Sequence, residues 1–353
     1  MTVTLMLTST GGVYSAQTIM QASASTRHDV RVVAVDAGDK AAAVNVADVF
    51  ARVPFGSDPE YVDRVCDVIK REKVDLVVPC SDEEALTLSA ARQQVENVGA
   101  TLACTDADTL AIFADKMKTY NALGEAGIAV ADWRYVETVD EFEAAFDELL
   151  NTHGEVAVRP AVSRGGRDVF VIRKDLTEIE SYLGGFELHM NLETFRGDHV
   201  QSCLEKLPLI VAERLTTPAY DADILAWQGE AVHVVPRRRL DHTGNSLGYV
   251  VGPDPEIEDM GRRLAKLFNL TWLYDVDLMT NMAGRPCIVE INPRPSGSFS
   301  MPIAAGVPIL DDLISLYKGE AVQPFPVPVN KRVVPYNGLY VVEDGKQQGE
   351  DGA

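Results

Sequence analysis

Oxygen-bearing side chains recur at every second position on two short segments near the C-terminal end of the chain. Asp275 and Asp277 alternate with apolar residues. Further along, Glu290 and Asn292 do the same. This alternation predicts two strands, and Met282–Arg285 between them predicts a hairpin turn. The hairpin would gather Asp277, Glu290 and Asn292 on one face as a cluster of oxygen ligands, which is the chemistry that binds Mg²⁺ beside substrate phosphates.

A cation and hydroxyl groups follow the predicted hairpin directly. The segment Pro293–Ser298 turns away from the second strand and carries Arg294 past the same sheet edge. An alternative interpretation is that the two strands simply turn their acidic residues toward water. The arginine and hydroxyls favour a metal and anion site instead, although Arg294 also fits a structural salt bridge.

A glycine-rich turn in the middle of the chain forms a second candidate anion site. It joins a predicted strand at Glu155–Pro160 to a predicted strand at Val169–Ile172. Glycines allow backbone N–H groups to approach a phosphate closely, and neighbouring arginines would supply positive charge. The residues concerned are Arg159, Ser163, Arg164, Gly165, Gly166 and Arg167. A solvated basic hairpin is the alternative interpretation.

The N-terminal part of the chain alternates strands with helices. Predicted strands are Val3–Leu7, Val30–Asp36, Val74–Pro79 and Ala100–Cys104, and predicted helices are Val13–Ala24 and Asp58–Lys73. This order predicts a parallel sheet covered by helices on both faces, as in a Rossmann-like α/β domain. The turn Ser9–Gly12 lacks the full Gly-x-Gly-x-x-Gly pattern, so it is a weak dinucleotide signal.

The second half of the chain has the pattern of an α+β protein. Predicted helices are Lys116–Ala126, Val139–Leu150, Glu178–Gly184 and Ile257–Phe268, and predicted strands are Ile210–Leu215, Asp221–Gln228 and Ala231–Arg239. Residues 188–196 fit either a strand or a loop. These elements predict an antiparallel sheet with helices on one side. Arg237 and Arg239 would share one face of their strand.

Composition limits the classes of protein and partner. The chain has 353 residues and a net charge of −21. This charge argues against binding to nucleic acid or to an anionic membrane, and no apolar run reaches the roughly 18 residues of a membrane span. The N-terminus predicts a strand in place of a signal peptide. Five dispersed cysteines without a Cys-x-x-Cys pair predict reduced thiols in a cytoplasmic protein.

The order of these motifs resembles the ATP-grasp superfamily, and within it the synthetase units of carbamoyl-phosphate synthase and related carboxylate–amine ligases. The most specific elements are Glu290–Ser298, which matches the family's Glu-x-Asn pair with an arginine two positions on, and Ala305–Pro308, which matches its Gly-Val-Pro-like segment. Asp115–Lys116 resembles the pair that opens the family's central subdomain. Arg159–Pro160 resembles the family's Lys/Arg-Pro strand.

The resemblance implies the ATP-grasp fold with three parts and a tail. Residues 1–110 would form a Rossmann-like pre-ATP-grasp domain with a parallel sheet. Residues 111–208 would form a small central α+β subdomain that carries the glycine loop at 163–167. Residues 209–320 would form the C-terminal antiparallel-sheet grasp domain with the metal site, and residues 321–353 a C-terminal tail, the end of which reads as disordered.

The resemblance also implies a reaction. The protein would bind ATP with Mg²⁺, or alternatively Mn²⁺, activate a small carboxylic acid as an acylphosphate and join it to an amine, releasing ADP and phosphate. An amino acid is the favoured acid, because Arg294, Ser296 and Ser298 suggest a small polar substrate. The family gives the Mg²⁺-ligand role to Asp277, Glu290 and Asn292. It gives Arg294 the role of binding the carboxylate or the oxyanion.

Further site residues follow from the same resemblance. Lys116 and Arg159 would hold the α- and β-phosphates under the glycine loop, which contains Ser163, Gly165 and Gly166. Glu213, Arg214 and Leu215 resemble the hinge that reads adenine through its backbone. Asp223, Arg237 and Arg239 would face the substrate and phosphates, with Arg239 near the γ-phosphate.

The sequence leaves the oligomeric state and two alternative activities open. Relatives are commonly dimers, so the resemblance implies a homodimer that acts on small-molecule acids and amines. A carboxylate kinase that releases the acylphosphate is one alternative activity. A nucleotide-binding protein without turnover is another, and Ala219 favours it because relatives commonly carry a ribose-binding acid at about this position.

Overall fold

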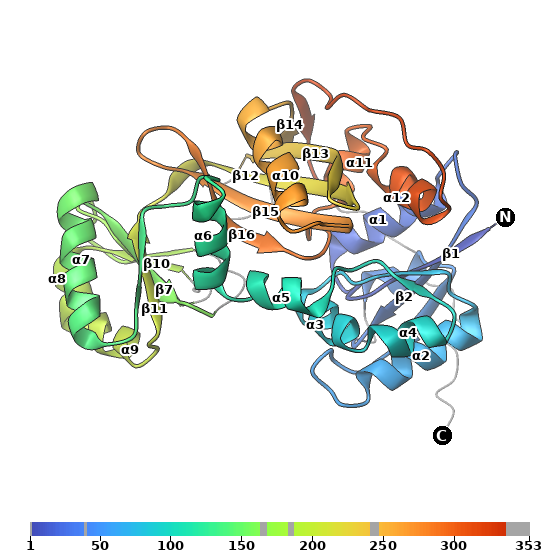
Figure 1. Cartoon of the computed structure of the whole chain (residues 1–353), viewed down its shortest axis with the longest axis horizontal. Coiled ribbons are helices and arrows are strands. Elements are labelled where there is room, and N and C mark those ends of the chain that lie inside the picture. The colour runs from blue at the N-terminus through green and yellow to red at the C-terminus, as the bar shows by residue number, and fades with distance from the viewer. Residues whose placement is uncertain (1, 39–40, 163–167, 183–186, 241–246, 337–353) are drawn as a thin grey trace.

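The computed structural model describes residues 2–38, 41–162, 168–182, 187–240 and 247–336. Strands form one five-stranded sheet and two six-stranded sheets. Figure 1 shows the N-terminal sheet and the last sheet side by side, with the middle sheet and helix α7 (Val139–His153) set apart at one end. Within the described residues, no helix has the length and apolar character needed to cross a bilayer.

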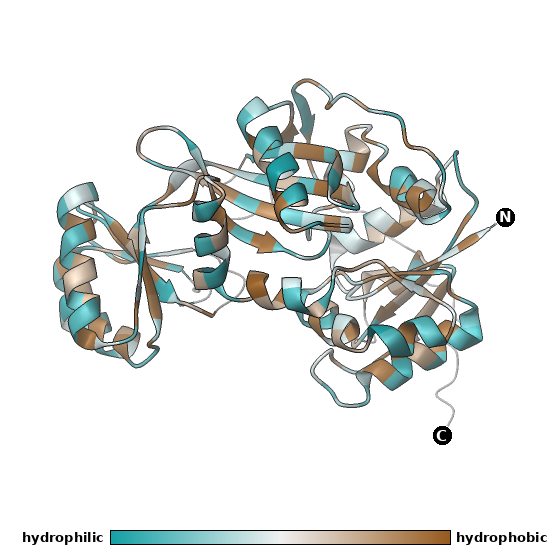
Figure 2. Ribbon diagram, in the orientation of Figure 1, coloured by the Kyte–Doolittle hydropathy of each residue, from teal (hydrophilic) through white to brown (hydrophobic). Residues whose placement is uncertain are grey.

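The N-terminal sheet has the strand order β3-β2-β1-β4-β5, and all its pairs are parallel, as predicted. Its strands are β1 (Val3–Leu7), β2 (Val30–Asp36), β3 (Val49–Arg52), β4 (Leu76–Val78) and β5 (Thr101–Leu102). Its helices are α1 (Val13–Ser23), α2 (Tyr61–Glu72), α3 (Asp82–Ala90) and α4 (Arg92–Asn97). Every residue of β1 is buried because helices cover both faces of this central strand. Figure 2 shows α2 and α4 with largely hydrophilic outer sides.

The middle sheet has the order β6-β11-β7-β8-β10-β9. Its strands are β6 (Trp133–Val136), β7 (Val156–Pro160), β8 (Val169–Ile172), β9 (Glu180–Tyr182), β10 (Glu187–Met190) and β11 (Leu209–Glu213). Helix α7 covers this sheet, and its buried Phe142, Phe146 and Leu149 share a core with the strands. The Thr138 side chain accepts a hydrogen bond from the Glu141 backbone, and the Glu141 side chain accepts one from the Thr138 backbone. This capping box fixes the start of α7 at Val139.

Two predictions in this part of the chain were wrong or incomplete. Residues 178–184 were expected to be helical, but Glu180–Tyr182 forms edge strand β9, paired antiparallel with β10. Antiparallel pairing with β10, which follows closely in sequence, overrides a weak helical pattern in so short a segment. After β10 the chain is helical, in α8 (Leu192–Thr194), a π-helical turn (Phe195–His199) and α9 (Val200–Leu204).

The third sheet carries most of the predicted site. Its order is β16-β15-β12-β13-β14-β17, and all its pairs are antiparallel. The strands are β12 (Thr216–Trp227), β13 (Glu230–Arg239), β14 (Tyr249–Val251), β15 (Trp272–Thr280), β16 (Pro286–Asn292) and β17 (Lys331–Val333). The predicted hairpin is β15–β16.

Helices flank both faces of the third sheet, whereas the sequence predicted helices on one side. On one face, Ile224, Val234 and Tyr274 pack with helix α10 (Pro255–Leu267). On the opposite face, the neighbouring residues Leu225, Val235 and Leu273 pack against α12 (Ile309–Tyr317) and the N-terminal sheet. Successive residues of these strands are all apolar over this half of the sheet, so both of its faces are buried under other elements.

Three further helices connect these units. Helix α5 (Ala107–Phe113) and helix α6 (Lys116–Glu125) link the first sheet to the middle one. Helix α11 (Ser300–Ala304) follows the segment after β16 and contacts α1. We propose that the domains follow the three sheets, with β11 counted in the central unit and β17 in the last.

Candidate functional site

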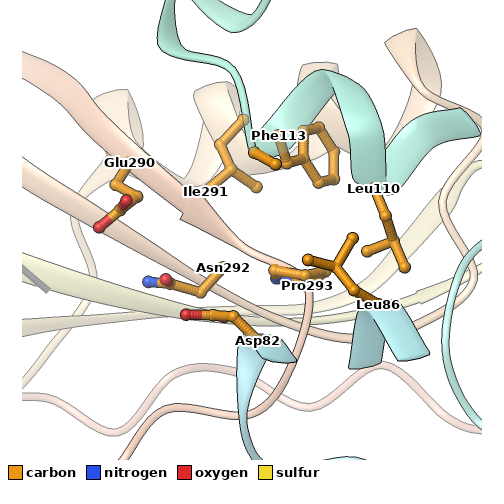
Figure 3. Close-up of a pocket in the computed structure, with 9 residues that line it drawn as sticks. Asp82, Leu86, Leu110, Phe113, Glu290, Ile291, Asn292 and Pro293 are labelled. Atoms are coloured by element: carbon orange, nitrogen blue, oxygen red, sulfur yellow. The ribbon is translucent and has the colours of Figure 1, made fainter. Parts of the chain in front are cut away.

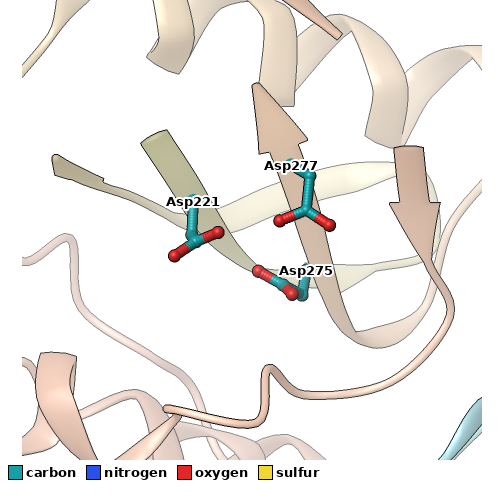
Figure 4. A group of neighbouring side chains, drawn as sticks. All are labelled: Asp221, Asp275 and Asp277. Atoms are coloured by element: carbon teal, nitrogen blue, oxygen red, sulfur yellow. The ribbon is translucent and has the colours of Figure 1, made fainter. Parts of the chain in front are cut away.

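One face of the third sheet changes from apolar to charged along its length. On β15, Leu273 lies in the core with α12, while Asp275 and Asp277 follow on the same face. Neighbouring strands extend the charged half of the face. Its members on the three central strands are Asp221, Asp223, Arg237, Arg239, Asp275 and Asp277. Figure 4 shows Asp221, Asp275 and Asp277 converging from two adjacent strands.

The structure brings the three predicted metal ligands together. Asp277 is the register partner of Glu290, and Asp275 is the partner of Asn292. The Asn292 amide nitrogen lies 3.2 Å from a carboxylate oxygen of Asp277 and 3.4 Å from one of Asp275. The Lys116 ammonium group lies 3.3 Å from Glu290. A predicted phosphate-binding cation therefore stands beside the predicted metal ligands.

Asp221 and Asp275 belong to this cluster but were not predicted as ligands. Oxygen atoms of Asp221, Asp275 and Asp277 lie within 4.8 Å of one another. The sequence holds a signal for this arrangement, since an Asp-x-Asp pair stands on each of two strands. The pairing of β12 with β15 aligns Asp221 with Asp277 and Asp223 with Asp275.

Charge in the cluster is not balanced. Its described members comprise six carboxylates (Asp82, Asp221, Asp223, Asp275, Asp277, Glu290) and four cations (Lys116, Arg237, Arg239, Arg294), which leaves a charge of −2 when all are ionised. One Asp275 oxygen has no hydrogen-bond partner among the described residues. A divalent cation would balance this charge and occupy such an oxygen, so the donor set fits Mg²⁺.

The pKa values reflect this imbalance. Burial, followed by the nearby Asp277 and Asp221 carboxylates, raises the pKa of Asp275 well above its usual range. Burial also raises the pKa of Asp277 to about 7, although Arg239 opposes the shift. Burial acts in the same direction on Asp221, but Arg239 and Arg237 together hold its pKa below the usual value. Without a bound cation, the two carboxyl groups of β15 are therefore the ones that take up a proton most readily, which relieves part of the excess negative charge.

Arg239 spans two strands of acidic residues. Its guanidinium group bonds Asp221 and lies 2.5 Å from Asp277. A quarter of the Arg239 side chain is exposed (25%), so it reaches the surface of the site. This position agrees with the predicted role near a phosphate, which stays a prediction.

Arg237 and Asp223 lie below the site surface, unlike the wall that the sequence predicted. Both side chains are fully buried, and the Arg237 guanidinium lies 2.5 Å from Asp223. Arg237 also donates to Ser298 at 2.8 Å and to Ser296 at 2.9 Å. Neither side chain is open to a ligand, because both are closed in by these partners and by the Tyr249 ring. We assign them the role of positioning the segment that follows Arg294.

Arg294 joins the N-terminal domain to the hairpin. Its guanidinium lies 3.2 Å from Asp82 at the start of α3 and 3.6 Å from Asp275 on β15. Beside it is a cavity of about 310 Å³ that Asp82, Glu290 and Asn292 line on the polar side. Figure 3 shows these three polar side chains grouped at one side, with apolar Leu86, Leu110, Phe113, Ile291 and Pro293 on the other.

Arg159 and the predicted hinge occupy the junction between the middle and third sheets. Arg159 bonds the Tyr120 hydroxyl, which donates to the Val289 carbonyl at 2.7 Å. Strand β7 is thereby linked to β16, which carries two of the predicted metal ligands. Glu213 ends β11, and its carboxylate accepts from the Asp132 amide at 2.9 Å. Leu215 lies directly before β12 and packs against the hydrophobic core that the third sheet shares with α10.

The predicted phosphate loop lies between β7 and β8 in the sequence. Ser163, Gly165 and Gly166 lie outside the described residues. Its two flanking strands, β7 and β8, do pair antiparallel as predicted. The ATP-contacting roles of these residues, of Lys116 and of the hinge remain predictions.

The three sheets have the arrangement of the ATP-grasp fold. Residues 205–338 match a family model described as ATP-grasp in the biosynthetic pathway with Ter operon. Residues 5–103 match a model of the PylC-like N-terminal domain. These matches confirm the resemblance of the chain to the ATP-grasp superfamily. No match is found among curated protein sequences.

Several solved structures share this fold at low sequence identity. N5-carboxyaminoimidazole synthetase from Staphylococcus aureus has a TM-score of 0.66 at 13% identity, over 94% of this chain and 80% of that chain. The biotin carboxylase domain of 2-oxoglutarate carboxylase from Hydrogenobacter thermophilus, solved with MgADP and bicarbonate, has a TM-score of 0.66 at 15% identity, over 93% and 72%. Phosphoribosylglycinamide synthetase from Anaerococcus prevotii has a TM-score of 0.62 at 16% identity, over 91% and 76%.

Proposed function

We propose that this protein is an ATP-dependent ligase that activates a carboxylic acid as an acylphosphate and joins it to an amine, with an amino acid as the favoured acid. The observation that carries the proposal is the pairing of Asp277 with Glu290 beside Asn292, with the cations Lys116, Arg239 and Arg294 around them. Phosphoryl transfer needs mainly positioning and charge neutralisation, and this cluster supplies both.

In the first step, a carboxylate oxygen attacks the γ-phosphorus of ATP, the bond to the β-phosphate oxygen breaks, and ADP leaves. Asp277, Glu290 and Asn292 would hold Mg²⁺, which supplies Lewis-acid charge at the phosphates when bound. Lys116 stands next to Glu290 and would neutralise phosphate oxygens. Arg239 would do the same from the opposite side of the cluster.

In the second step, the amine nitrogen attacks the carbonyl carbon and the carbon–oxygen bond to phosphate breaks. Negative charge develops on the carbonyl oxygen, so a fixed cation lowers the barrier. Arg294 would serve this role, because Asp82 and Asp275 orient its guanidinium from two domains. Arg237 supports it indirectly by holding Ser296 and Ser298.

One observation favours a second candidate reaction. Two of the similar solved structures are named for carboxylation chemistry, and one of them contains bicarbonate. In such a reaction bicarbonate would take the place of the organic acid. A carboxylate kinase and a nucleotide-binding protein without turnover are the further alternatives.

The test measures ADP and phosphate release from Mg-ATP with pooled acids and pooled amines, and with bicarbonate in place of the acids. Release that needs an acid and an amine together supports the ligase. Release with acid alone indicates the kinase, and release with bicarbonate and an amine indicates carboxylation. Glu290→Gln removes the charge of one proposed metal ligand and should abolish release. Glu256→Gln is the matched control, because Glu256 pairs with Arg285 at the exposed start of α10.

We further propose that the protein acts as a cytoplasmic homodimer. The five cysteines lie among the described residues, and all are free thiols, which agrees with a reducing compartment. Light scattering of the purified protein at several concentrations measures its mass directly. A monomer mass throughout the range would contradict the dimer.

A further inference from the structure

A second cavity lies where the order of strands reverses in the N-terminal sheet. Strand β1 pairs with β2 on one side and with β4 on the other, and Leu7 is the register partner of Val78 at the ends of β1 and β4. In open parallel sheets, ligands bind outside the carboxyl ends of the strands at this switch point. Leu7 and Val78 both line the cavity.

The walls of this cavity come from three parts of the chain. It encloses about 490 Å³, including solvent at its mouth. The N-terminal domain contributes Leu7, Thr10, Tyr14, Ser15, Thr18, Val78 and Cys80, and the rest of the wall is Leu273, Pro295, Ser296, Gly297, Phe299 and Leu310. Most of its wall is apolar, and it lies at the place in the sheet where ligands are expected to bind.

The lining carries no residue of the ionised types Asp, Glu, Lys, Arg or His. Its buried hydroxyls are used inside the protein. Thr10 donates to Val35, Thr18 donates to Tyr14, and Ser296 accepts from Arg237. Burial raises the pKa of the Cys80 thiol to about 12, so this group is neutral too. An ionised substrate group would lose part of its hydration here without gaining a charged partner.

The cavity adjoins Arg294 through the chain on both sides. Pro295 and Ser296 line it directly after Arg294 in sequence. Cys80 lines it two positions before Asp82, which is the ion-pair partner of Arg294. These short connections place the cavity next to the chain segments that carry Arg294 and Asp82.

We propose that this cavity binds the side group of the acid substrate and selects an uncharged, mainly apolar one. The inference rests on the proposed function for the identity of the molecule, because it assigns the carboxylate end to Arg294. It narrows the expected substrate from a small polar acid to an amino acid with an apolar side chain of moderate size.

The test compares amino acids that differ only in the side chain. L-norleucine and L-leucine provide apolar groups, and L-glutamate and L-lysine provide charged groups of similar reach. Binding is measured as the increase in melting temperature in the presence of Mg-ADP, and turnover as ADP release with pooled amines. We expect the apolar pair to raise the melting temperature, and their kcat/KM to exceed that of the charged pair at least about tenfold.

Three variants test whether this selectivity for apolar side chains arises at the cavity. Ser15→Asp puts a charge into the wall on the first turn of α1, where an acidic residue suits the helix N-terminus and folding is preserved. It should reduce norleucine affinity at least about tenfold and leave the affinity for Mg-ADP unchanged. Thr18→Val makes the wall more apolar and should keep or strengthen norleucine binding. Ser23→Asp adds the same charge at the exposed end of the helix and should change neither.

The outcomes separate this inference from the proposed function. Equal binding of the charged and apolar amino acids overturns the cavity assignment, as does norleucine binding that Ser15→Asp leaves intact, or no stabilisation by any member of the panel. Stabilisation by norleucine that Ser15→Asp removes, without ADP release for any acid and amine, keeps the cavity assignment and refutes the ligase.

Discussion

The guanidinium group of Arg239 lies 2.5 Å from the carboxylate of Asp277. Arg239 is predicted to contact a phosphate group, and Asp277 is predicted to bind a metal ion. In the structure these two side chains are paired with each other. The pair neutralises part of the charged face in the absence of ligands, and Mg²⁺ at Asp277 would leave Arg239 available to a phosphate oxygen.

Removal of the Arg239 charge should strengthen metal binding and weaken turnover. In Arg239→Gln, Asp277 loses its competing cation, so Mn²⁺ affinity without nucleotide should rise about tenfold, or about 1.4 kcal/mol. ATP-dependent turnover should fall about a hundredfold, because a group that stabilises the transferring phosphate is lost. Titration with Mn²⁺ and steady-state kinetics measure the two effects. Arg238→Gln is the control, since Arg238 is exposed on the other face of β13. Weaker Mn²⁺ binding with unchanged turnover would contradict this account.

Arg237 should matter for stability as much as for activity. Arg237→Met leaves Asp223 buried without its 2.5 Å partner, and we expect a loss of about 3–5 kcal/mol in the free energy of unfolding. Urea denaturation measures this loss. Asp223→Asn combined with Arg237→Met should recover part of it, because the uncompensated charge is then gone. Additive losses in the double variant would show that the pair is not coupled.

Gly261 lets α10 approach the third sheet closely. A Cβ atom at this position would lie 2.6 Å from a methyl carbon of Val234, so Gly261→Ala should destabilise the protein by about 1–3 kcal/mol. Val234→Ala in the same chain should relieve the clash. Gly124→Ala on α6 serves as the control, because nothing lies within 4 Å of the added atom and alanine favours helix. A stabilising effect of Gly261→Ala in thermal denaturation would contradict this packing.

Asp312 ties three elements together at the base of the third sheet. Its carboxylate lies 2.6 Å from His233 on β13 and 2.6 Å from Arg27 after α1. Burial opposes ionisation, but hydrogen bonds from His233 and Arg27 dominate and lower the pKa of Asp312. A lowered pKa adds stability above the unfolded value of about 3.9, and this contribution is lost as the pH falls through the folded pKa.

Asp312→Asn should therefore lower the free energy of unfolding by about 3 kcal/mol near neutral pH, and less at more acidic pH. Urea denaturation between pH 7 and about pH 3 tests this dependence. Asp311→Asn is the neighbouring control, because Asp311 accepts a bond from Ser25 in a less buried position. A deficit that stays constant down to the acid end would show that ionisation of Asp312 is not the cause.

The sequence predicted those features that a local pattern encodes. Alternation of Asp277 and of Glu290 with apolar neighbours predicted the hairpin, and the β-α-β order predicted the parallel sheet. Features that depend on contacts between distant strands were missed. Asp221 joins the cluster only through the register of β12 on β15. The apolar cavity likewise needs Leu7 and Leu310 to meet across domains. Edge strand β9 was missed for another reason, since a strand of 3 residues is too short to show a period-2 pattern.

In the proposed mechanism, a substrate carboxylate becomes an acylphosphate before it reacts with the amine. The most direct measurement uses the acid and amine identified by ADP release, with the carboxylate oxygens of the acid labelled by a heavy oxygen isotope. Because the carboxylate oxygen that attacks ATP departs with phosphate, we predict one labelled oxygen in each phosphate, detectable by phosphorus NMR, and no turnover in Glu290→Gln. Amide formation with unlabelled phosphate would contradict the mechanism.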